Sequence, residues 1–474
     1  MSNSDPLAQR SQSASPSFET GAKEQSDRKI SFLLAATNSG CGKTTLTIGI
    51  LRALHRKGIA VRPFKCGPDY IDTQYHRMAS GVESVNLDAR FTTAEHLREV
   101  FSRYSRDVNV VEGVMGLFDG YDRHHGSSAE IASILGIPVI IIINARSLAY
   151  SAAGIIHGFK TLRTDIHIAG VIFNQVGSER HASFLRQACE DTHTLCLGCI
   201  PRIPEMEIPS RHLGLSLDNE QRIESLIHLA ADAVEKHLDW EQMMKMEVPS
   251  NRAPSQPPRG EEKAIRTVIH SPSGETEGGF EVGRGLGLHI SIARDSAFNF
   301  TYLENIDRLK ALGPVTFFSP LTDKQIPPST HLLYLPGGYP EFFLSQLSSN
   351  HSMLESIRNF IENGGRCLAE CGGMMYLCSN IIGMDGNTYP MANVLHQTAT
   401  LQGMKLHLGY REWKGITSDG TPYLFHGHEF HYSHIVEEEP QNHPAHPPIY
   451  IYKNLRASYI HIYWGDKDLL QLWR

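Results

Sequence analysis

The stretch AATNSGCGKTTLTIGI, residues 35–50, constrains the possible folds of this chain more than any other feature. It continues the apolar run ISFLLAA and leads into the helical pattern TTLTIGILRAL. A glycine-rich turn between a strand and a helix directs backbone N–H groups and the helix N-terminus at an anion. We therefore predict a phosphate-binding loop, in which Lys43 contacts the β- and γ-phosphates of a nucleotide and the Thr44 hydroxyl binds Mg²⁺.

Two residues in this loop depart from common patterns. The usual motif is G-x-x-x-x-G-K-[ST], and Thr37 stands where its first glycine is expected. Partition-type ATPases of this broad class carry a second, signature lysine at the position of Asn38. The asparagine therefore argues against a switch ATPase and favours the synthetase branch of the same superfamily. The nucleotide contacts predicted in the loop are Thr37, Asn38, Ser39, Gly40, Gly42, Lys43 and Thr44.

Short apolar runs alternate with helical patterns from residue 29 to about residue 238. The runs after the first are VRPFK, VNVVEG, IPVIIIIN and IAGVIFN. Enrichment in Val, Ile and Phe, with turn residues after each run, is typical of buried parallel strands. Helices between parallel strands require right-handed crossovers, so the sequence predicts a doubly wound α/β sheet. The same alternation returns in LGLHISIARD, VTFFSP, HLLYLPGG and RCLAECGG, which predicts a second α/β domain.

Changes in composition divide the chain into four segments. Residues 1–28 are rich in Ser, Gln and Asp and are predicted to be a disordered tail. Residues 29–245 form the first predicted domain, and residues 246–285 form a linker rich in Pro, Ser and Gly. Residues 286–474 form the second predicted domain, in which the polar stretch VEEEPQNHPAHPP, from Val436, is predicted to be an exposed loop.

The bulk properties argue against several classes of protein. A net charge of −7 does not suit a general nucleic-acid-binding surface. No apolar run reaches the roughly 18 residues of a membrane helix, and the N-terminal segment lacks the apolar core of a signal peptide. The eight cysteines are scattered, which favours a reducing, cytoplasmic compartment. Cys196 and Cys199 form a C-x-x-C without a second pair at zinc-like spacing, so we interpret both as structural.

Acidic residues gather in loops at the predicted strand ends, where α/β sheets build their sites. These loops lie in FKCGPDYIDTQYH, VVEGVMGLFDG and GSSAE. Glu112 ends a buried strand, where a carboxylate can hold Mg²⁺ beside the phosphates. A single loop acid is usually only solvated, but Asp69, Asp72 and Asp119 join Glu112 after one phosphate loop. The four acids together therefore predict one site.

The second half carries the pattern of a cysteine nucleophile. RCLAECGGMMYL predicts a strand, a sharp turn and a helix, with Cys371 at the turn. A helix N-terminus favours the thiolate, and the turn offers the Gly372 N–H group to an oxyanion. The loop LPGGYPE adds a second predicted oxyanion donor, Gly338. His461, in SYIHIYW, is the predicted base partner of the cysteine.

Several long motifs resemble one family. AATNSGCGKTT, FKCGPDYID, NLD, VVEGVMGLFDG, GVIFNQVGSERH and RHLGL are similar to the cobyrinic acid a,c-diamide synthases. The second half resembles a class I glutamine amidotransferase domain of the cobyrinate and cobyric acid type. The resemblance implies a P-loop, dethiobiotin synthetase-like amidoligase domain followed by the amidotransferase domain. It also implies ATP- and glutamine-dependent amidation of the a and c acetates of cobyrinate in cobalamin biosynthesis, through a phosphorylated carboxylate.

The resemblance also implies roles for individual residues. Thr37 becomes a family trait, and Asn174 approaches the adenine. Asn144 is a departure, because relatives often carry Asp there. The Mg²⁺ ligands implied are Thr44, Asp69 and Glu112. The residues implied for substrate and intermediate are Asp69, Tyr70, Ile71, Asp72 and Asp119.

The amidotransferase resemblance implies a Cys371–His461 dyad. The usual third member, an acid two residues after the histidine, is replaced by Tyr463. The stretch GHEFHYS, residues 427–433, belongs to the same resemblance, and its His and Glu residues line the interface or order the site. We do not predict a metal there, because H-E-x-H lacks the histidine spacing of metalloproteases. The residues in question are His428, Glu429 and His431.

Alternatives remain open at this point. Nickel-sirohydrochlorin and hydrogenobyrinate are other macrocycles for the same a,c-diamidation, whereas cobyric acid synthase fits less well because of GPDYID and the motif order. An alternative of another class is a switch ATPase with an inactive amidotransferase domain. The expected partners are small molecules, a corrinoid macrocycle and L-glutamine, with no nucleic acid or membrane. A homodimer is also an open possibility.

Overall fold

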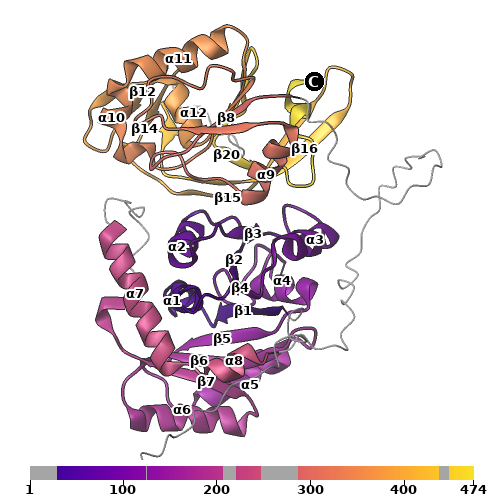
Figure 1. Ribbon diagram of the computed structural model, residues 1–474, viewed down its shortest axis with the longest axis vertical. Coiled ribbons are helices and arrows are strands. Elements are labelled where there is room, and N and C mark those ends of the chain that lie inside the picture. The colour runs from indigo at the N-terminus through magenta and orange to yellow at the C-terminus, as the bar shows by residue number, and fades with distance from the viewer. Residues whose placement is uncertain (1–28, 124, 207–219, 247–286, 437–447) are drawn as a thin grey trace, which may run out of the picture.

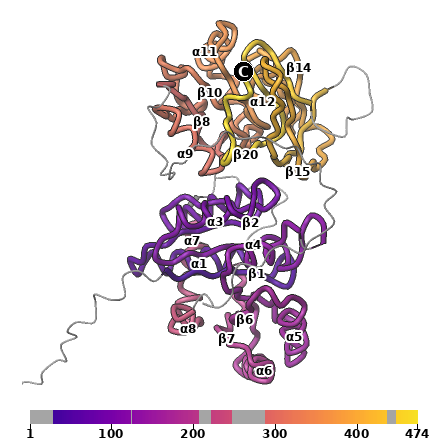
Figure 2. Tube along the Cα trace, turned by 90° about the vertical axis from the view of Figure 1, so that its right-hand side faces the viewer, coloured from indigo at the N-terminus to yellow at the C-terminus, as the bar shows by residue number. Residues whose placement is uncertain are grey.

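Figures 1 and 2 show the chain as two layered bodies, one from each half of the sequence. The computed structural model describes residues 29–123, 125–206, 220–246, 287–436 and 448–474. The predicted tail, nearly all of the predicted linker and most of the loop predicted from Val436 lie outside the described residues. In Figure 1 the C-terminal body sits on the side of the N-terminal body that carries α2 (Ile71–Ser80) and α3 (Ala94–Tyr104), and Figure 2 shows α3 on that same side.

The N-terminal body is built on a seven-stranded sheet in the order β3-β2-β4-β1-β5-β6-β7. All neighbouring strands in it are parallel, which confirms the predicted doubly wound sheet. The five apolar runs noted in the sequence all form strands, and two further strands flank them at the sheet edges. The strands are β1 (Ile30–Ala36), β2 (Val61–Cys66), β3 (Val85–Leu87), β4 (Val108–Glu112), β5 (Val139–Asn144), β6 (Ile168–Val176) and β7 (Leu195–Pro201).

Helices cover both faces of this sheet because alternate strand residues point to opposite sides. In β1, Phe32 and Leu34 join the core beneath α1 (Lys43–Arg56) and α7 (Glu220–His237). Leu33 and Ala35 join the opposite core, beneath α3 and its neighbours. The remaining helices are α4 (Ser128–Leu135), α5 (Ala152–Leu162), α6 (Glu179–Asp191) and α8 (Trp240–Met244), with a short 3₁₀ helix at Pro204–Met206.

The C-terminal body has a main sheet of six strands in the order β18-β19-β11-β10-β8-β9. Its pairs are parallel except for the edge pair of β18 and β19. Four of the strands are the apolar runs predicted for this half. The strands are β8 (Ile290–Ala293), β9 (Val315–Phe318), β10 (Leu332–Leu335), β11 (Arg366–Glu370), β18 (Tyr450–Tyr452) and β19 (Leu455–Ser458). The helices are α9 (Leu303–Leu312), α10 (Leu344–Ser349), α11 (His351–Glu362) and α12 (Gly372–Leu377), with 3₁₀ helices at Pro340–Phe342 and Leu469–Trp473.

Two smaller sheets complete this body and were not predicted as separate elements. One is a three-stranded antiparallel sheet of β15 (His407–Ile416), β16 (Pro422–His431) and β20 (Ile460–Tyr463). The other comprises β12 (Cys378–Ile382), β13 (Thr388–Pro390), β14 (Leu395–Thr400) and β17 (His434–Ile435). The three-stranded sheet faces the N-terminal body in Figure 1.

The two bodies meet through an aromatic cluster surrounded by polar contacts. Tyr70 and Phe91 from the N-terminal half pack with Phe300, Tyr302, Tyr339 and Tyr463 from the C-terminal half. At the rim, Glu304 contacts His96 and Arg103, each at 3.1 Å. An apolar centre with a polar rim is the usual anatomy of a specific protein interface. Among the described residues, no helix is long and apolar enough to cross a membrane.

Candidate active site

The phosphate loop joins β1 to α1 and depends on a glycine at its last position. Gly42 has φ 93°, which a side chain disfavours. A Cβ atom there would lie 2.3 Å from Nδ2 of Asn174, and that same amide donates to the Cys41 carbonyl at 2.9 Å. Asn174, at the end of β6, therefore supports the loop from behind. This contact adds to the adenine role that the sequence implied for it.

A cavity of about 770 Å³ opens in front of this loop. Thr37 and Asn38 do not line it. Their side chains bond to each other at 2.9 Å, and the Asn38 amide donates to the Ser39 carbonyl at 2.8 Å, so they shape the loop from outside. Asn144 lines the cavity, and its Oδ1 accepts from the Arg146 N–H group. The predicted site residues that line the cavity are Ser39, Gly40, Gly42, Lys43, Thr44, Asp69, Asp72, Glu112 and Asn174.

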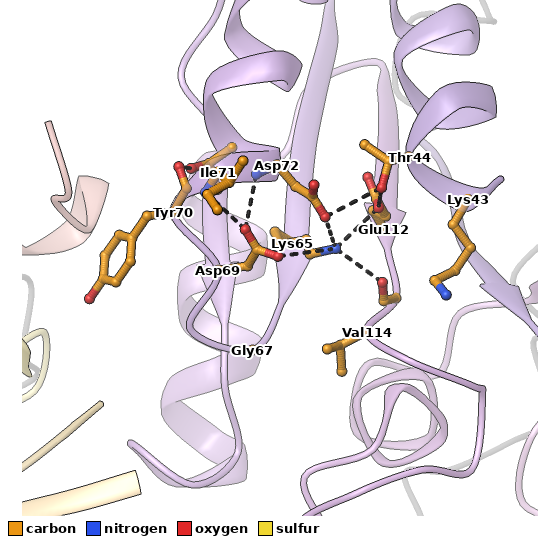
Figure 3. Close-up of polar contacts among 12 residues, drawn as sticks. Lys43, Thr44, Lys65, Gly67, Asp69, Tyr70, Ile71, Asp72, Glu112 and Val114 are labelled. Atoms are coloured by element: carbon orange, nitrogen blue, oxygen red, sulfur yellow. Dashed lines mark hydrogen bonds and ion pairs between the residues drawn. The ribbon is translucent and has the colours of Figure 1, made fainter. Parts of the chain in front are cut away.

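Lys43 lies at the edge of this cavity, separate from the carboxylates. Its Nζ donates to the Met115 carbonyl, in the loop that follows β4. Burial lowers the pKa of Lys43, and the positive charge of Lys65 lowers it further. Figure 3 shows the Lys43 side chain on the far side of Thr44 from the other lysine.

A second buried lysine, Lys65, gathers the predicted acids (Figure 3). Its Nζ lies 2.6 Å from Asp72 Oδ2, 3.1 Å from Glu112 Oε1 and 4.0 Å from Asp69 Oδ2. On the other side of Glu112, His76 contacts Oε2 at 2.6 Å. The parallel register places Lys65 beside Glu112, since these residues are partners in β2 and β4. Sequence reasoning missed both Lys65 and His76.

This cluster keeps its charges although it is buried. Burial by itself lowers the pKa of Lys65, but the attraction of Asp72 and Glu112 outweighs it and raises that pKa above its ordinary value. Burial likewise opposes ionisation of Glu112, yet Lys65 and His76 hold its pKa well below the ordinary value. A buried charge persists only when it is paired and hydrogen-bonded, and each of these groups has such partners.

The oxygen atoms around Thr44 suit a magnesium ion. Thr44 Oγ1 donates to Glu112 Oε1 at 2.7 Å and to Asp72 Oδ2 at 3.4 Å. Magnesium takes hard oxygen ligands in octahedral geometry at about 2.0–2.1 Å, which puts adjacent ligands about 3 Å apart. The spacing of these oxygen atoms therefore fits the ion, and Thr44 and Glu112 stay predicted ligands. Asp72, which contacts Thr44, is a further candidate ligand beside the predicted third ligand, Asp69.

The loop from Asp69 to Asp72 points in two directions. Asp69 Oδ1 accepts from the N–H groups of Ile71 and Asp72, each at 2.9 Å, and so begins α2. Tyr70 turns away from the carboxylates (Figure 3) and stacks on Phe300 with ring centroids 4.9 Å apart. The loop thus reaches both the phosphate cavity and the C-terminal body.

Two further residues, Asp119 from the predicted site and Asn86 from the NLD motif, support the site without lining the cavity. Asp119 Oδ2 accepts from the Gly116 N–H group at 2.9 Å and shapes the loop after Glu112. Asn86, in the NLD motif, donates to the carbonyls of Gly67 and Asp69 and holds the loop that precedes α2. These contacts assign both side chains to positioning the loops around the cavity.

Cys371 lies at a sharp turn between β11 and α12, as predicted. Its φ of 46° is rare for a residue with a side chain, and its N–H group donates to Ser458 O at 2.7 Å. A Cβ atom on Gly372 would lie 2.8 Å from Pro340 and 3.3 Å from the Gly338 nitrogen. The two predicted oxyanion donors, Gly338 and Gly372, therefore come from loops that pack directly together beside the cysteine.

The electrostatics of Cys371 differ from the expectation of a favoured thiolate. Burial raises the pKa of the thiol, and the nearby Glu341 raises it further. The Gly372 N–H group at the start of α12 lowers the pKa but does not overcome burial, since Cys371 is 3% exposed. The thiol is thus protonated until a base removes its proton.

His461 is fully buried in β20 against the loop that contains Gly337. A Cβ atom on Gly337 would lie 2.2 Å from Cε1 of the histidine, so only glycine leaves room for the ring. Burial lowers the pKa of His461 to about 3. Neither ring nitrogen has a hydrogen-bond partner among the described residues. The nearest acid is Glu370, with Oε2 at 3.9 Å from Nδ1.

The GHEFHYS stretch forms the end of β16 and the two residues after it, beside the strand β20 that carries His461. Glu429 Oε2 forms an ion pair with Arg411 at 2.6 Å, and Glu429 Oε1 contacts His431 at 2.8 Å. His428 faces its register partner His461 across β16 and β20. Among the described residues, no group of three His, Cys, Asp or Glu side chains could hold a metal ion. That these side chains line the interface or order the site stays a prediction.

Known families match both halves of the chain. Residues 32–215 match the CobQ/CobB/MinD/ParA nucleotide binding domain, and residues 289–469 match the CobB/CobQ-like glutamine amidotransferase domain. The first match spans the phosphate loop and the carboxylates. The second spans Cys371 and His461.

Proteins of known name are similar over nearly the whole length. A cobyrinate a,c-diamide synthase of Caldanaerobacter subterraneus subsp. tengcongensis is 37% identical over 91% of this chain and 94% of its own. A hydrogenobyrinate a,c-diamide synthase of Brucella anthropi is 37% identical over 86% of this chain and 90% of its own. A cobyrinate a,c-diamide synthase of a Synechococcus species is 36% identical over 93% of this chain and 96% of its own. The similarity therefore extends across both sites.

Proposed function

The chain belongs to the cobyrinate a,c-diamide synthase family, and from this premise we propose that it amidates the a and c acetates of cobyrinate with ATP and glutamine. One observation carries the proposal. A phosphate cavity with paired carboxylates lies in one body, a buried Cys371 and a buried His461 lie in the other, and the two bodies are joined by an aromatic cluster in which Tyr70 contacts His461 with ring centroids 5.0 Å apart. A ligase that moves ammonia between two sites needs such a junction.

The first site activates the carboxylate. A carboxylate is a poor electrophile at neutral pH, so an oxygen of the acetate attacks the γ-phosphorus of ATP and ADP leaves. The product is an acyl phosphate. Lys43 and Lys65 offset the negative charge that accumulates when a carboxylate meets a triphosphate. Ammonia then attacks the acyl carbon, phosphate departs, and a carboxamide remains.

Magnesium would be held by Thr44, Glu112 and Asp72. When bound, the ion neutralises the phosphate oxygens and aligns the γ-phosphoryl group. Lys65 already balances the same carboxylates, and its contacts orient them toward the cavity. Asp69, which lines the cavity, lies where it can orient ammonia or take its proton after the attack.

The second site releases ammonia from glutamine. The Cys371 thiol gives its proton to His461, and the sulfur bonds to the amide carbon of glutamine. The carbonyl oxygen becomes an oxyanion, for which Gly338 and Gly372 offer backbone N–H groups. The C–N bond breaks, the nitrogen takes the proton from His461 and leaves as ammonia, and water then hydrolyses the thioester to glutamate.

The cavity beside Cys371 is small. Its volume of about 20 Å³ is enough for one water molecule. It is lined by Gly338, Tyr339, Met375 and Phe430 among others. Glutamine therefore enters only when these loops move apart, and the closed arrangement keeps bulk water from the site. Because Tyr70 extends from the substrate loop to His461, occupancy of the first site can be sensed at the second.

The decisive variant is Cys371→Ala. We expect glutamine-dependent amidation to fall by at least about 10³-fold, because the nucleophile is lost. Amidation with free ammonium should stay within about twofold of the wild-type rate, since the first site is untouched. Product amides would be measured by mass spectrometry. Loss of both activities in a folded variant contradicts the proposed division of labour.

A second candidate substrate is hydrogenobyrinate, the metal-free corrin. A hydrogenobyrinate enzyme and a cobyrinate enzyme are both 37% identical to this chain, so similarity does not rank the two macrocycles. Nickel-sirohydrochlorin is the third macrocycle to compare. The kcat/KM values for the three substrates, with ATP and glutamine saturating, decide among them. A preference for hydrogenobyrinate of more than about tenfold would replace cobyrinate in the proposal.

A further inference from the structure

The base of the second site has no partner at the position where one is expected. His461 needs a hydrogen on Nδ1 so that the lone pair on Nε2 can accept the thiol proton. In triads of this kind an acid accepts the Nδ1–H hydrogen bond and so fixes the tautomer. The usual position of that acid, two residues after the histidine, holds Tyr463.

The Tyr463 side chain makes its contacts away from His461. Its hydroxyl donates to Glu304, which also contacts His96 and Arg103 at the interface between the two bodies. Its ring stacks on Phe91 with centroids 5.5 Å apart. The side chain thus serves the interface, and its oxygen is not offered to His461.

Another acid faces the unpartnered nitrogen. Glu370, the residue before the nucleophile, places Oε2 at 3.9 Å from Nδ1 of His461 and is 1% exposed. It is the only acid that pairs with His461 among the described residues. Hydrogen bonds around catalytic groups are often long before substrate binds and shorten in the complex. The distance therefore suits a contact that closes during turnover.

Glu370 is held in this orientation by two neighbouring strands. Its Oε1 accepts from the N–H group of Ile462, the residue after the histidine, at 2.9 Å. Its Oε2 accepts from the Tyr334 hydroxyl at 2.7 Å. Both oxygens are therefore fixed by groups that do not move with the side chain, which is the requirement for a residue that orients another.

We propose that Glu370 positions His461, by accepting a hydrogen bond from Nδ1–H, in place of the acid that Tyr463 replaces. Glu370 takes no proton in this role. The proton from Cys371 moves to Nε2 and then to the departing ammonia, while the Nδ1–H bond stays in place. The inference rests on the glutaminase activity proposed above and adds a residue to it.

Burial supports this role. It raises the pKa of Glu370 to about 8 and lowers the pKa of His461 to about 3, so the pair carries little charge at neutral pH. A protonated carboxyl still offers a lone pair to Nδ1–H. An uncharged pair also avoids the desolvation cost of a buried ion pair before the reaction begins.

Glu370→Gln tests the proposal with an almost identical shape. The Ile462 N–H group requires an acceptor, so the glutamine oxygen takes the Oε1 position. The NH₂ group then occupies the Oε2 position and points a donor at Nδ1, which forces the proton of His461 onto Nε2. We expect kcat with glutamine to fall by at least about 100-fold, with KM for glutamine unchanged within about twofold. Ammonium-dependent amidation should be unchanged.

The matched control is Tyr463→Phe, which removes the hydroxyl at the usual acid position and keeps the ring. It should retain kcat with glutamine within about threefold. An unchanged kcat in Glu370→Gln overturns the proposal, and so does a loss of ammonium-dependent amidation, which would mark Glu370 as a residue of the fold. Absence of glutamine-dependent amidation in the wild type would instead overturn the proposed function, since that measurement does not involve Glu370.

Discussion

Both sites bury ionisable groups, but these groups are charged at the first site and neutral at the second. At the phosphate cavity, Glu112 contacts Lys65 at 3.1 Å and His76 at 2.6 Å, and burial does not neutralise Glu112 because the Lys65 charge and these hydrogen bonds hold its pKa well below the ordinary value. At the cysteine site, Glu370 and His461 lie 3.9 Å apart and burial moves both pKa values toward the neutral form. The first site thus holds permanent charge, as phosphate chemistry requires. The second holds groups that gain charge only during the reaction.

The largest expected effect comes from breaking the charge balance of the first site. Lys65→Met leaves Glu112 and Asp72 buried without their shared cation. We expect the free energy of unfolding to fall by about 3–5 kcal/mol, because removing one partner of a buried ion pair leaves an uncompensated charge. Urea unfolding measures it.

Activity with both nitrogen sources should fall together in this variant, since the defect lies before ammonia is used. Lys57→Met is the control: this exposed lysine at the end of α1 loses only its contact with the Trp240 ring, 5.7 Å away, and should change stability by at most about 1 kcal/mol. A Lys65→Met protein with wild-type stability and activity would contradict the account of the first site.

A smaller effect follows from the pH dependence of the second site. The pKa of Glu370 is about 8 in the folded protein and near its ordinary value of 4.5 when unfolded. Its contribution to stability is therefore complete below pH 4.5 and is lost as pH rises toward 8. Glu370→Gln has no group that titrates at this position, so its stability does not fall in this way. The free energy of unfolding of the variant relative to the wild type should therefore be higher at pH 7 than at pH 5 by about 1–3 kcal/mol. Unfolding curves at the two pH values measure the difference. A pH-independent difference would mean that Glu370 is ionised in the folded protein.

The smallest effect concerns the junction between the sites. Tyr70→Leu removes the ring that packs on His461 and Phe300. We expect the amide formed per glutamine hydrolysed to fall by about tenfold, since the contact is worth about 1.4 kcal/mol. Phe91→Leu alters the same cluster without contacting the histidine and should preserve the ratio. If both variants formed the same amount of amide per glutamine hydrolysed, Tyr70 would have no role in coupling the two sites.

Local patterns were sufficient for much of this molecule. The strand–loop–helix at Lys43 and the strand–turn–helix at Cys371 were predicted because each motif is contiguous, and the buried strands followed from their Val and Ile runs. The small sheets of the C-terminal half were missed because their strands, such as β16, mix polar and apolar residues.

The residues that tune each site could not be predicted in the same way. Lys65 pairs with Glu112 only because of the register of β2 against β4, which brings the two residues together although they are 47 positions apart in the sequence. A signal existed, since a lysine within a buried strand rarely lacks a partner. Glu370 was overlooked because the acid was sought after the histidine, whereas the fold supplies it from the residue before the cysteine.

The central claim is that ammonia made at Cys371 is used at the phosphate cavity without leaving the protein. The direct measurement is amidation of cobyrinate with glutamine labelled with ¹⁵N at its amide, in the presence of excess unlabelled ammonium. The account predicts that both new carboxamides, at a and c, carry ¹⁵N in nearly all of the product. Incorporation of unlabelled nitrogen in proportion to the ammonium in solution would contradict it.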